Sequence, residues 1–227
     1  MNKFFLSRRA VPALLILLGC ASQGTHVETR VGGPETDAVL DLTRLVPYRP
    51  LTRADFQADE LPRELRGLGL GAVTVVCVYA TPCNIETVSR GVAQERWYEA
   101  IVSPFRYEAR MNPARSWWDP NQNLKEDHFL DHEQTHFAIA EVGVRRANAR
   151  IDEIRSHIRS HASTRDEAVR LAIAQFAAEL HWVQGEISAR NAQFDEETAN
   201  GQREVRNDAW VKMVQHEIDE TSALPVR

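Results

Sequence analysis

The stretch FLDHEQTHFAIAE, residues 129–141, lies near the start of the segment that decides the fold. Proline is absent from Asn121 until Pro225, and apolar residues recur at helical spacing across this region. We therefore expect long helices over residues 123–222, with breaks near residues 160–163 and 199–201. Thr164, followed three residues later by Glu167, has the pattern of a capping box that opens one of these helices.

The preceding segment, residues 51–122, is rich in β-branched and aromatic residues. Strands are predicted over residues 72–79, 97–102 and 105–111, and Asn-Pro and Asp-Pro pairs mark turns. The expected fold class is therefore α+β, with a small β-rich N-terminal half packed on long C-terminal helices. Residues 51–222 are expected to form one domain, of which residues 51–122 are the β-rich part.

The first 19 residues have the features of an export signal. Three basic residues, Lys3, Arg8 and Arg9, precede an apolar run over residues 11–18 that is much shorter than a transmembrane helix. The run ends in LLGCAS, which resembles the box at which bacterial lipoprotein signals are cut before a lipid-bearing cysteine. This resemblance implies lipidation at Cys20, sorting to the outer membrane and a periplasmic location; the alternative is an ordinary signal peptide with an incidental cysteine.

The composition is that of a soluble globular protein, with 43% apolar and 26% charged residues. The net charge is −5, which makes nucleic acid a poor candidate partner. Residues 20–50 contain several glycines and prolines and are expected to form a flexible tether after Cys20. In an oxidising periplasm, Cys77 and Cys83 could form a disulfide across a short loop; the alternative is two free buried cysteines.

The pattern H-E-x-x-H at residues 132–136 carries the chemistry. Two histidines four residues apart on a helix lie on one face, with Cβ atoms about 5–6 Å apart. Both imidazoles can then reach one zinc ion, at Zn–N distances of about 2.0–2.1 Å. Glu133 is rotated about 100° from His132, so it can miss the metal and act as the general base on a water beside it.

A catalytic zinc usually takes three protein ligands and a water. Glu141 lies nine residues after His132 and would face about 180° away on a straight helix. His128 is two turns from His136, too far for one ion to contact both along with His132. Other candidates lie in the downstream acidic run, which consists of Asp195, Glu196 and Glu197.

Four patterns together resemble an uncharacterised bacterial family of predicted secreted zinc-dependent proteases. They are L-T-x-x-D-F at residues 51–56, S-W at 116–117, H-E-Q-x-H-F-x-I-A-E at 132–141, and F-D-x-x-T-x-N-G at 194–201, with a later tryptophan at 210. The resemblance covers most of residues 51–215. It implies a zincin-like metallopeptidase, in which Asp195 is the preferred third ligand.

The chain departs from the family pattern at two positions. Phe194 stands where the family tends to have tyrosine, and Asn200 where it tends to have histidine. If that histidine serves as a ligand or a transition-state donor, its replacement puts catalysis in doubt. Trp117 and Trp118 precede the metal helix and could line a substrate cleft, although packing is the commoner role for tryptophan.

The leading functional hypothesis is an envelope-anchored zinc metallopeptidase. His132, His136 and Asp195 would bind Zn²⁺, and Glu133 would activate water against a peptide bond in an envelope protein or in peptidoglycan. The competing hypothesis is a non-catalytic lipoprotein, either a degenerate zincin that binds metal without cutting or a helical scaffold that binds a partner.

Overall fold

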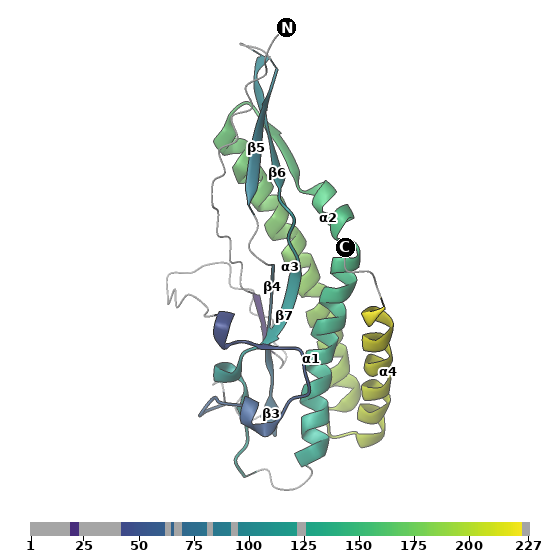
Figure 1. The fold of residues 1–227 in the computed structure, drawn as a ribbon. Coiled ribbons are helices and arrows are strands. Elements are labelled where there is room, and N and C mark those ends of the chain that lie inside the picture. Colours follow the sequence, from purple (N-terminus) through teal and green to yellow (C-terminus); the bar gives the residue numbers. More distant parts are fainter. Residues whose placement is uncertain are drawn as a thin grey trace. The chain divides into compact units, whose positions relative to one another are not determined.

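The structure is a computed structural model that describes residues 19–22, 42–61, 65, 70–80, 84–91, 95–121 and 126–223. It confirms the α+β class: strands dominate the N-terminal half, and long helices dominate the C-terminal half (Figure 1). The strands are β1 (Gly19–Ser22), β2 (Val46–Pro47), β3 (Ala72–Val73), β4 (Val75–Ala80), β5 (Ile85–Arg90), β6 (Trp97–Val102), β7 (Tyr107–Met111), β8 (Trp117–Trp118) and β9 (Arg159–Ala162). The helices are α1 (Glu126–Ala149), α2 (Ile151–His157), α3 (Arg165–Thr198) and α4 (Glu204–Ser222).

The strands form three small sheets, with orders β1-β4-β7-β2, β3-β8 and β5-β6-β9. The pairs β1–β4, β2–β7, β3–β8, β5–β6 and β6–β9 are antiparallel. β4 is buried along almost its whole length, as its run of valines predicts. Cys77 is fully buried in this strand, whereas Cys83 lies outside the described residues.

The chain divides into two compact units, and both β4 and α3 contribute to each. One unit contains residues 79–107 and 150–182. The other contains residues 18–78, 108–149 and 183–227 and includes the H-E-x-x-H motif.

The first unit is built on the β5-β6-β9 sheet and the first half of α3. Phe105 packs edge-to-face against both Tyr107 and Phe176, so α3 contacts the segment between β6 and β7. The break in the helical run predicted at residues 160–163 is present, and strand β9 (Arg159–Ala162) occupies most of it. A strand forms there because Ser160 and its neighbours pair with β6, and the Ser160 hydroxyl donates a hydrogen bond to the Ala168 carbonyl.

The second unit has a core made by three helices. α4 runs alongside α1 (Figure 1), and the second half of α3 completes the cluster. The buried residues of this cluster are Ala138, Ile139 and Val142 of α1, Phe194 of α3, and Trp210, Val214 and Ile218 of α4. α1 and α3 approach closely at Gly143, where an added Cβ would lie 2.4 Å from the Ile187 Cγ1 atom.

Both ends of α3 follow from local sequence. Thr164 accepts a hydrogen bond from the Glu167 backbone N–H at 3.3 Å, which is one half of the predicted capping box. At the other end, Ala199, Asn200 and Gly201 all have positive φ angles, of 50°, 53° and 81°. These left-handed residues stop the helix and turn the chain into α4. The predicted interruption at residues 199–201 is therefore confirmed.

The chain around the start of the β-rich part is held against α1. Tyr48 packs edge-to-face on Phe137, and the Leu51 N–H donates a 2.6 Å hydrogen bond to the Gln134 side chain. Within the predicted tether, residues 46–47 form β2 and Leu45 is buried. Most of the rest of the tether, and residues 1–18 of the predicted signal, lie outside the described residues.

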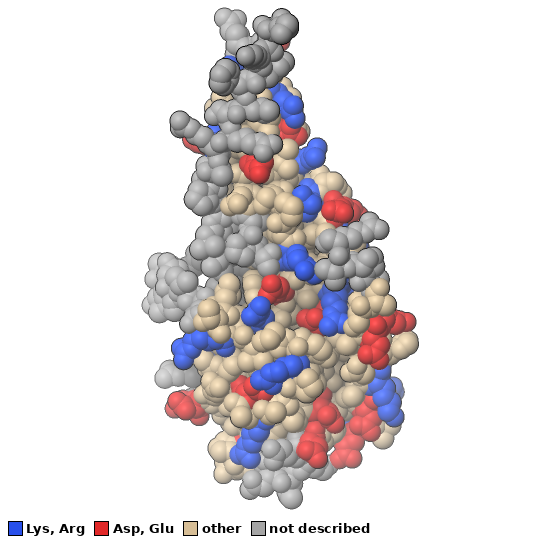
Figure 2. Space-filling view, viewed as in Figure 1, with Lys and Arg blue, Asp and Glu red and all other residues tan. Residues whose placement is uncertain are grey.

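Charged residues of both signs are interspersed on the face shown in Figure 2. Several charged residues of the helical region form short-range pairs, for example Arg150 with Glu153 and Arg170 with Glu167. Among the helices that the structure describes, none has the length and apolar content needed to cross a membrane.

Candidate metal centre

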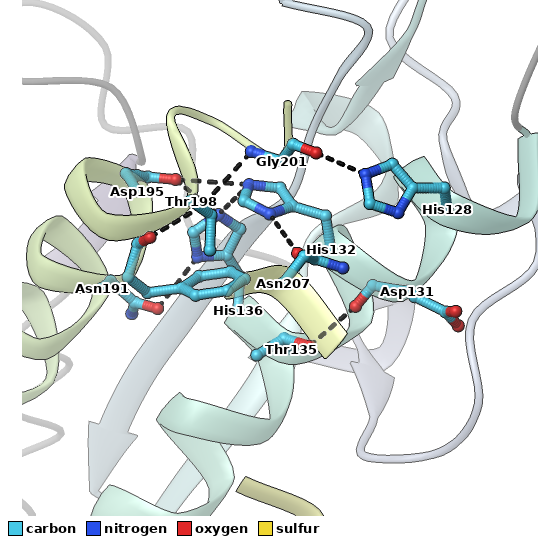
Figure 3. Close-up of polar contacts among 11 residues, drawn as sticks. His128, Asp131, His132, Thr135, His136, Asn191, Asp195, Thr198, Gly201 and Asn207 are labelled. Carbon is cyan, nitrogen blue, oxygen red and sulfur yellow. Dashed lines mark hydrogen bonds and ion pairs between the residues drawn. The ribbon is translucent and has the colours of Figure 1, made fainter. Parts of the chain in front are cut away.

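His132 and His136 lie one turn apart on α1 and point their imidazoles into the same space (Figure 3). Both residues are almost completely buried, with exposed fractions of 3% and 2%. Their Nε2 atoms are 3.1 Å apart. The i, i+4 spacing therefore does what the sequence predicts and brings two ring nitrogens together.

Asp195 is the third member of this group and comes from the last turn of α3. Its Oδ1 atom lies 3.3 Å from the His132 Nε2 and 3.0 Å from the His136 Nε2. Three ligands of a tetrahedral zinc, bound at about 2.0–2.1 Å, would be separated by about 3.3 Å. The three potential donor atoms thus form a triangle of nearly the size that one zinc ion requires.

The Asp195 carboxylate is in an environment that keeps it ionised. Burial alone would raise its pKa, but the interactions with His136 and His132 outweigh this effect. The pKa of Asp195 therefore lies well below its ordinary value. An ionised carboxylate between two imidazoles is a suitable donor set for a divalent cation.

Two asparagines that the sequence interpretation did not single out hold the other side of each imidazole. The Asn207 Oδ1 lies 3.0 Å from the His132 Nδ1, and the Asn191 Oδ1 lies 3.0 Å from the His136 Nδ1. Asn191 was detectable in principle, because it precedes Asp195 by one helical turn and must share its face. Asn207 comes from α4, and nothing in its local sequence indicates a role.

The donor triangle lies against an aromatic wall. The Phe194 ring stacks on His132 at a centroid distance of 4.5 Å and meets His136 edge-on at 4.8 Å. Phe194 is fully buried, so it excludes water from this side of the group. Gly201 closes another side: an added Cβ would lie 3.1 Å from the His132 Cγ atom.

Glu133 lies beside the triangle without joining it. It is 4% exposed, and its Oε2 atom has no hydrogen-bond partner among the described residues. Burial raises the pKa of Glu133, and the charge of Asp195 adds to this, while His132 and Thr74 oppose it. A buried carboxyl oxygen without a partner is unusual in a protein interior, and such groups often have a functional role.

A small cavity of about 20 Å³ opens over these groups. Its volume is enough for about one water molecule. It is lined by Leu70, Gly71, Ala72, Val73, Phe129, His132, Glu133, His136, Asp195 and Asn200. Both residues of β3 thus face the potential ligands. Asn200 also lines the cavity, and its backbone N–H donates a 2.9 Å hydrogen bond to the Asp195 carbonyl oxygen.

The remaining candidate ligands are placed elsewhere. Glu141 pairs with Arg145 at 2.7 Å, and Glu197 accepts a 2.9 Å hydrogen bond from the Trp210 indole. Glu196 is exposed. His128 contacts the Gly201 carbonyl oxygen, so it supports the turn that covers His132 (Figure 3).

The tryptophans before α1 do not line this cavity. Trp117 and Trp118 form β8, and Trp118 is buried against Phe56. Trp118 therefore packs in the interior.

Comparison with known proteins gives no relative: no protein-family model, no curated protein and no solved structure matches the chain. The chemistry of the site is therefore inferred from its own residues.

Proposed function

We propose that the protein is a zinc-dependent peptidase of the bacterial cell envelope. The observation that carries this proposal is a buried carboxylate, Glu133, set beside three converging donor atoms of His132, His136 and Asp195. Two imidazole nitrogens and one carboxylate oxygen form a donor set typical of catalytic zinc, which keeps its fourth position for water or substrate.

The residues divide the work of hydrolysis among them. His132, His136 and Asp195 would hold the metal, which supplies a Lewis acid that polarises the scissile carbonyl. Glu133 would accept the proton of the attacking water and pass it to the leaving amine. Phe194 would keep bulk water away from the charged groups, which strengthens their electrostatic interactions.

Zinc content and hydrolysis should be measured on the full chain, purified in detergent. We expect about one zinc per wild-type chain, and none in the double variant His132→Ala/His136→Ala. Glu133→Gln should keep the metal and lower the rate of casein hydrolysis by about 10²–10⁴-fold. An unmetallated wild type, or a Glu133→Gln variant as active as wild type, would contradict the proposal.

A second candidate function is supported by the size of the cavity, which accommodates little more than a water molecule. In this case the protein is a metal-binding envelope lipoprotein that does not cut peptides, and the ion stabilises the helices. Zinc binding without hydrolysis of casein or of purified peptidoglycan would favour this second function.

The envelope location rests on the signal-like N-terminus and Cys20. In the bacterial host, the wild-type chain should be found in the outer-membrane fraction and carry lipid. Cys20→Ser should prevent lipid attachment and release the chain from that fraction, which metabolic labelling with palmitate and membrane fractionation would show. A wild-type chain that takes up no palmitate would contradict the anchor without bearing on the metal centre.

A further inference from the structure

We infer that Asn191 and Asn207 are positioning residues that fix the tautomer of the two histidines, so that both Nε2 atoms present lone pairs to a metal. This inference rests on the proposed function and extends it beyond the donor atoms. Each asparagine contacts the Nδ1 atom of one imidazole, at 3.0 Å, whereas Asp195 faces the Nε2 atoms (Figure 3).

The chemistry follows from which amide atom faces the ring. In both pairs it is the side-chain carbonyl oxygen, which can only accept a hydrogen bond. The partner Nδ1 atom must therefore carry a proton and donate it. A neutral imidazole has one N–H, so the Nε2 atom of each ring is then unprotonated and free to bind a metal.

This arrangement calls for a cation. With both Nδ1 atoms protonated, two Nε2 lone pairs face each other across 3.1 Å, and the Asp195 carboxylate lies 3.0–3.3 Å from both. Three electron-rich atoms at these separations repel one another unless a positive charge lies between them. The opposite orientation of the amides would place an N–H on each Nε2 and give a metal-free triad donating to Asp195.

There is also a physical reason for asparagine, and not aspartate, at positions 191 and 207. Asn207 is fully buried and Asn191 is 3% exposed, so a charge at either position would be costly to desolvate. The charge of a divalent ion is already partly balanced by the Asp195 carboxylate. Neutral acceptors orient the imidazoles without adding further negative charge to the interior.

The two asparagines come from different helices. Asn191 is on α3 with Asp195, whereas Asn207 is on α4 and contributes no candidate ligand of its own. Metal affinity should therefore depend on the side-chain amide of Asn207 in α4, although α4 carries none of the three candidate ligands.

The test compares zinc affinity in Asn191→Leu and Asn207→Leu, which keep approximate size and remove the acceptor. Competition with a chromogenic chelator on the full chain should show affinity about 10–100-fold weaker than wild type. Asn191→Asp and Asn207→Asp should bind zinc more tightly than the leucine variants, because an ionised carboxylate can only accept from Nδ1–H and the charge of the metal offsets part of the cost of burying it. Gln193→Leu is the matched control, because Gln193 lies on α3 near Asn191, is exposed and bonds only to Glu197 among the described contacts.

Long-range ¹H–¹⁵N spectra of the histidine rings give a second readout that a structural role would not change. The zinc-loaded wild type should show protonated Nδ1 and metal-bound Nε2 for both His132 and His136. Folded leucine variants that bind zinc as tightly as wild type, or a wild type that coordinates through Nδ1, would overturn the inference and leave the proposed function intact. A wild type that binds no zinc overturns both.

Discussion

At the scale of single residues, each histidine of the candidate centre is held at both ends of its ring. One nitrogen faces an asparagine oxygen, and the other faces the Asp195 carboxylate. The ring planes are held further by Phe194. Little reorganisation is then needed when an ion enters, which is a condition for tight binding at a preformed site.

A substitution at Gly201 would show how closely the chain packs against the His132 ring. It has a φ angle of 81°, and a Cβ would lie 3.1 Å from the His132 Cγ and 3.2 Å from its Nδ1. We expect Gly201→Ala to lower the free energy of unfolding by about 1–2 kcal/mol, because of the left-handed backbone, and to weaken zinc binding by displacing the ring. Urea denaturation and chelator competition measure the two effects.

Gly185 is the matched control for that substitution. It lies within α3, and an added Cβ would meet nothing within 4 Å. Gly185→Ala should raise the free energy of unfolding by about 0.5–1 kcal/mol through helix propensity and leave zinc affinity unchanged. Equal zinc affinity in both alanine variants would show that the turn at Gly201 does not constrain His132.

Sequence reasoning reached the residues whose role depends on local spacing. The i, i+4 pair of histidines and the intervening Glu133 are defined within one helical turn, so their convergence could be predicted before any fold was known. Asp195 required a motif as well, because its neighbours Glu196 and Glu197 have similar chemistry. Asn207 could not be found, since only the packing of α4 brings it to His132.

At the scale of secondary-structure elements, the contact between α1 and α3 depends on one glycine. A Cβ on Gly143 would lie 2.4 Å from the Ile187 Cγ1 and 2.8 Å from its Cδ1. We expect Gly143→Ala to cost about 1–3 kcal/mol of stability through overpacking. In an Ile187→Ala background the same change should cost less, because the clash is gone, and chemical denaturation of all four proteins completes the cycle. Additive effects would contradict a direct contact.

The short helical turn Arg53–Asp55, near the start of the β-rich part, gives a prediction about pH. Asp55 is buried; desolvation would raise its pKa, but hydrogen bonds from Arg49 and Thr52 outweigh this and hold the pKa below its ordinary value. Because the folded-state pKa lies below the unfolded value of about 3.9, the carboxylate stabilises the fold above that pH. This stabilisation is lost as the pH falls through the folded-state pKa.

Asp55→Asn should therefore lower the free energy of unfolding at pH 7 by about 1–3 kcal/mol, with a smaller effect at pH 3. Urea unfolding at the two pH values measures this difference. Asp59→Asn, at an exposed carboxylate four residues later, is the control and should change little at either pH. A loss in Asp55→Asn that is as large at pH 3 as at pH 7 would exclude the ionised pair as its cause.

Elements whose apolar residues recur with a clear helical or strand period were predicted well. Strands that form only by pairing with another strand were not. β6 has the predicted bounds, and α1 begins within a few residues of the expected start. The short polar strand β9 was missed because its sequence has no alternation of apolar residues. It is a strand only because β6 offers an edge with which it can pair.

At the scale of the whole molecule, the candidate ligands belong to one of the two compact units. Zinc should therefore stabilise that unit by mass action, by about 2.7 kcal/mol when free zinc is 100 times the dissociation constant. For a chain of this size we expect the melting temperature to rise by about 5–10 °C on zinc addition and to fall with EDTA. Calorimetry measures the shift.

His132→Ala/His136→Ala is the control for this stabilisation, because it removes two of the three candidate ligands. Its melting temperature should be the same with zinc and with EDTA. A zinc-dependent shift of equal size in that variant would locate the binding elsewhere in the chain.

The place of Asn207 in the last helix has a consequence for biogenesis. A ribosome completes α1 and α3 before α4, so a nascent or truncated chain can possess every candidate ligand and still lack the amide that orients His132. Full metal affinity would then be reached only once α4 is in place. A peptidase assembled in this order would become active only after α4 has packed against α1.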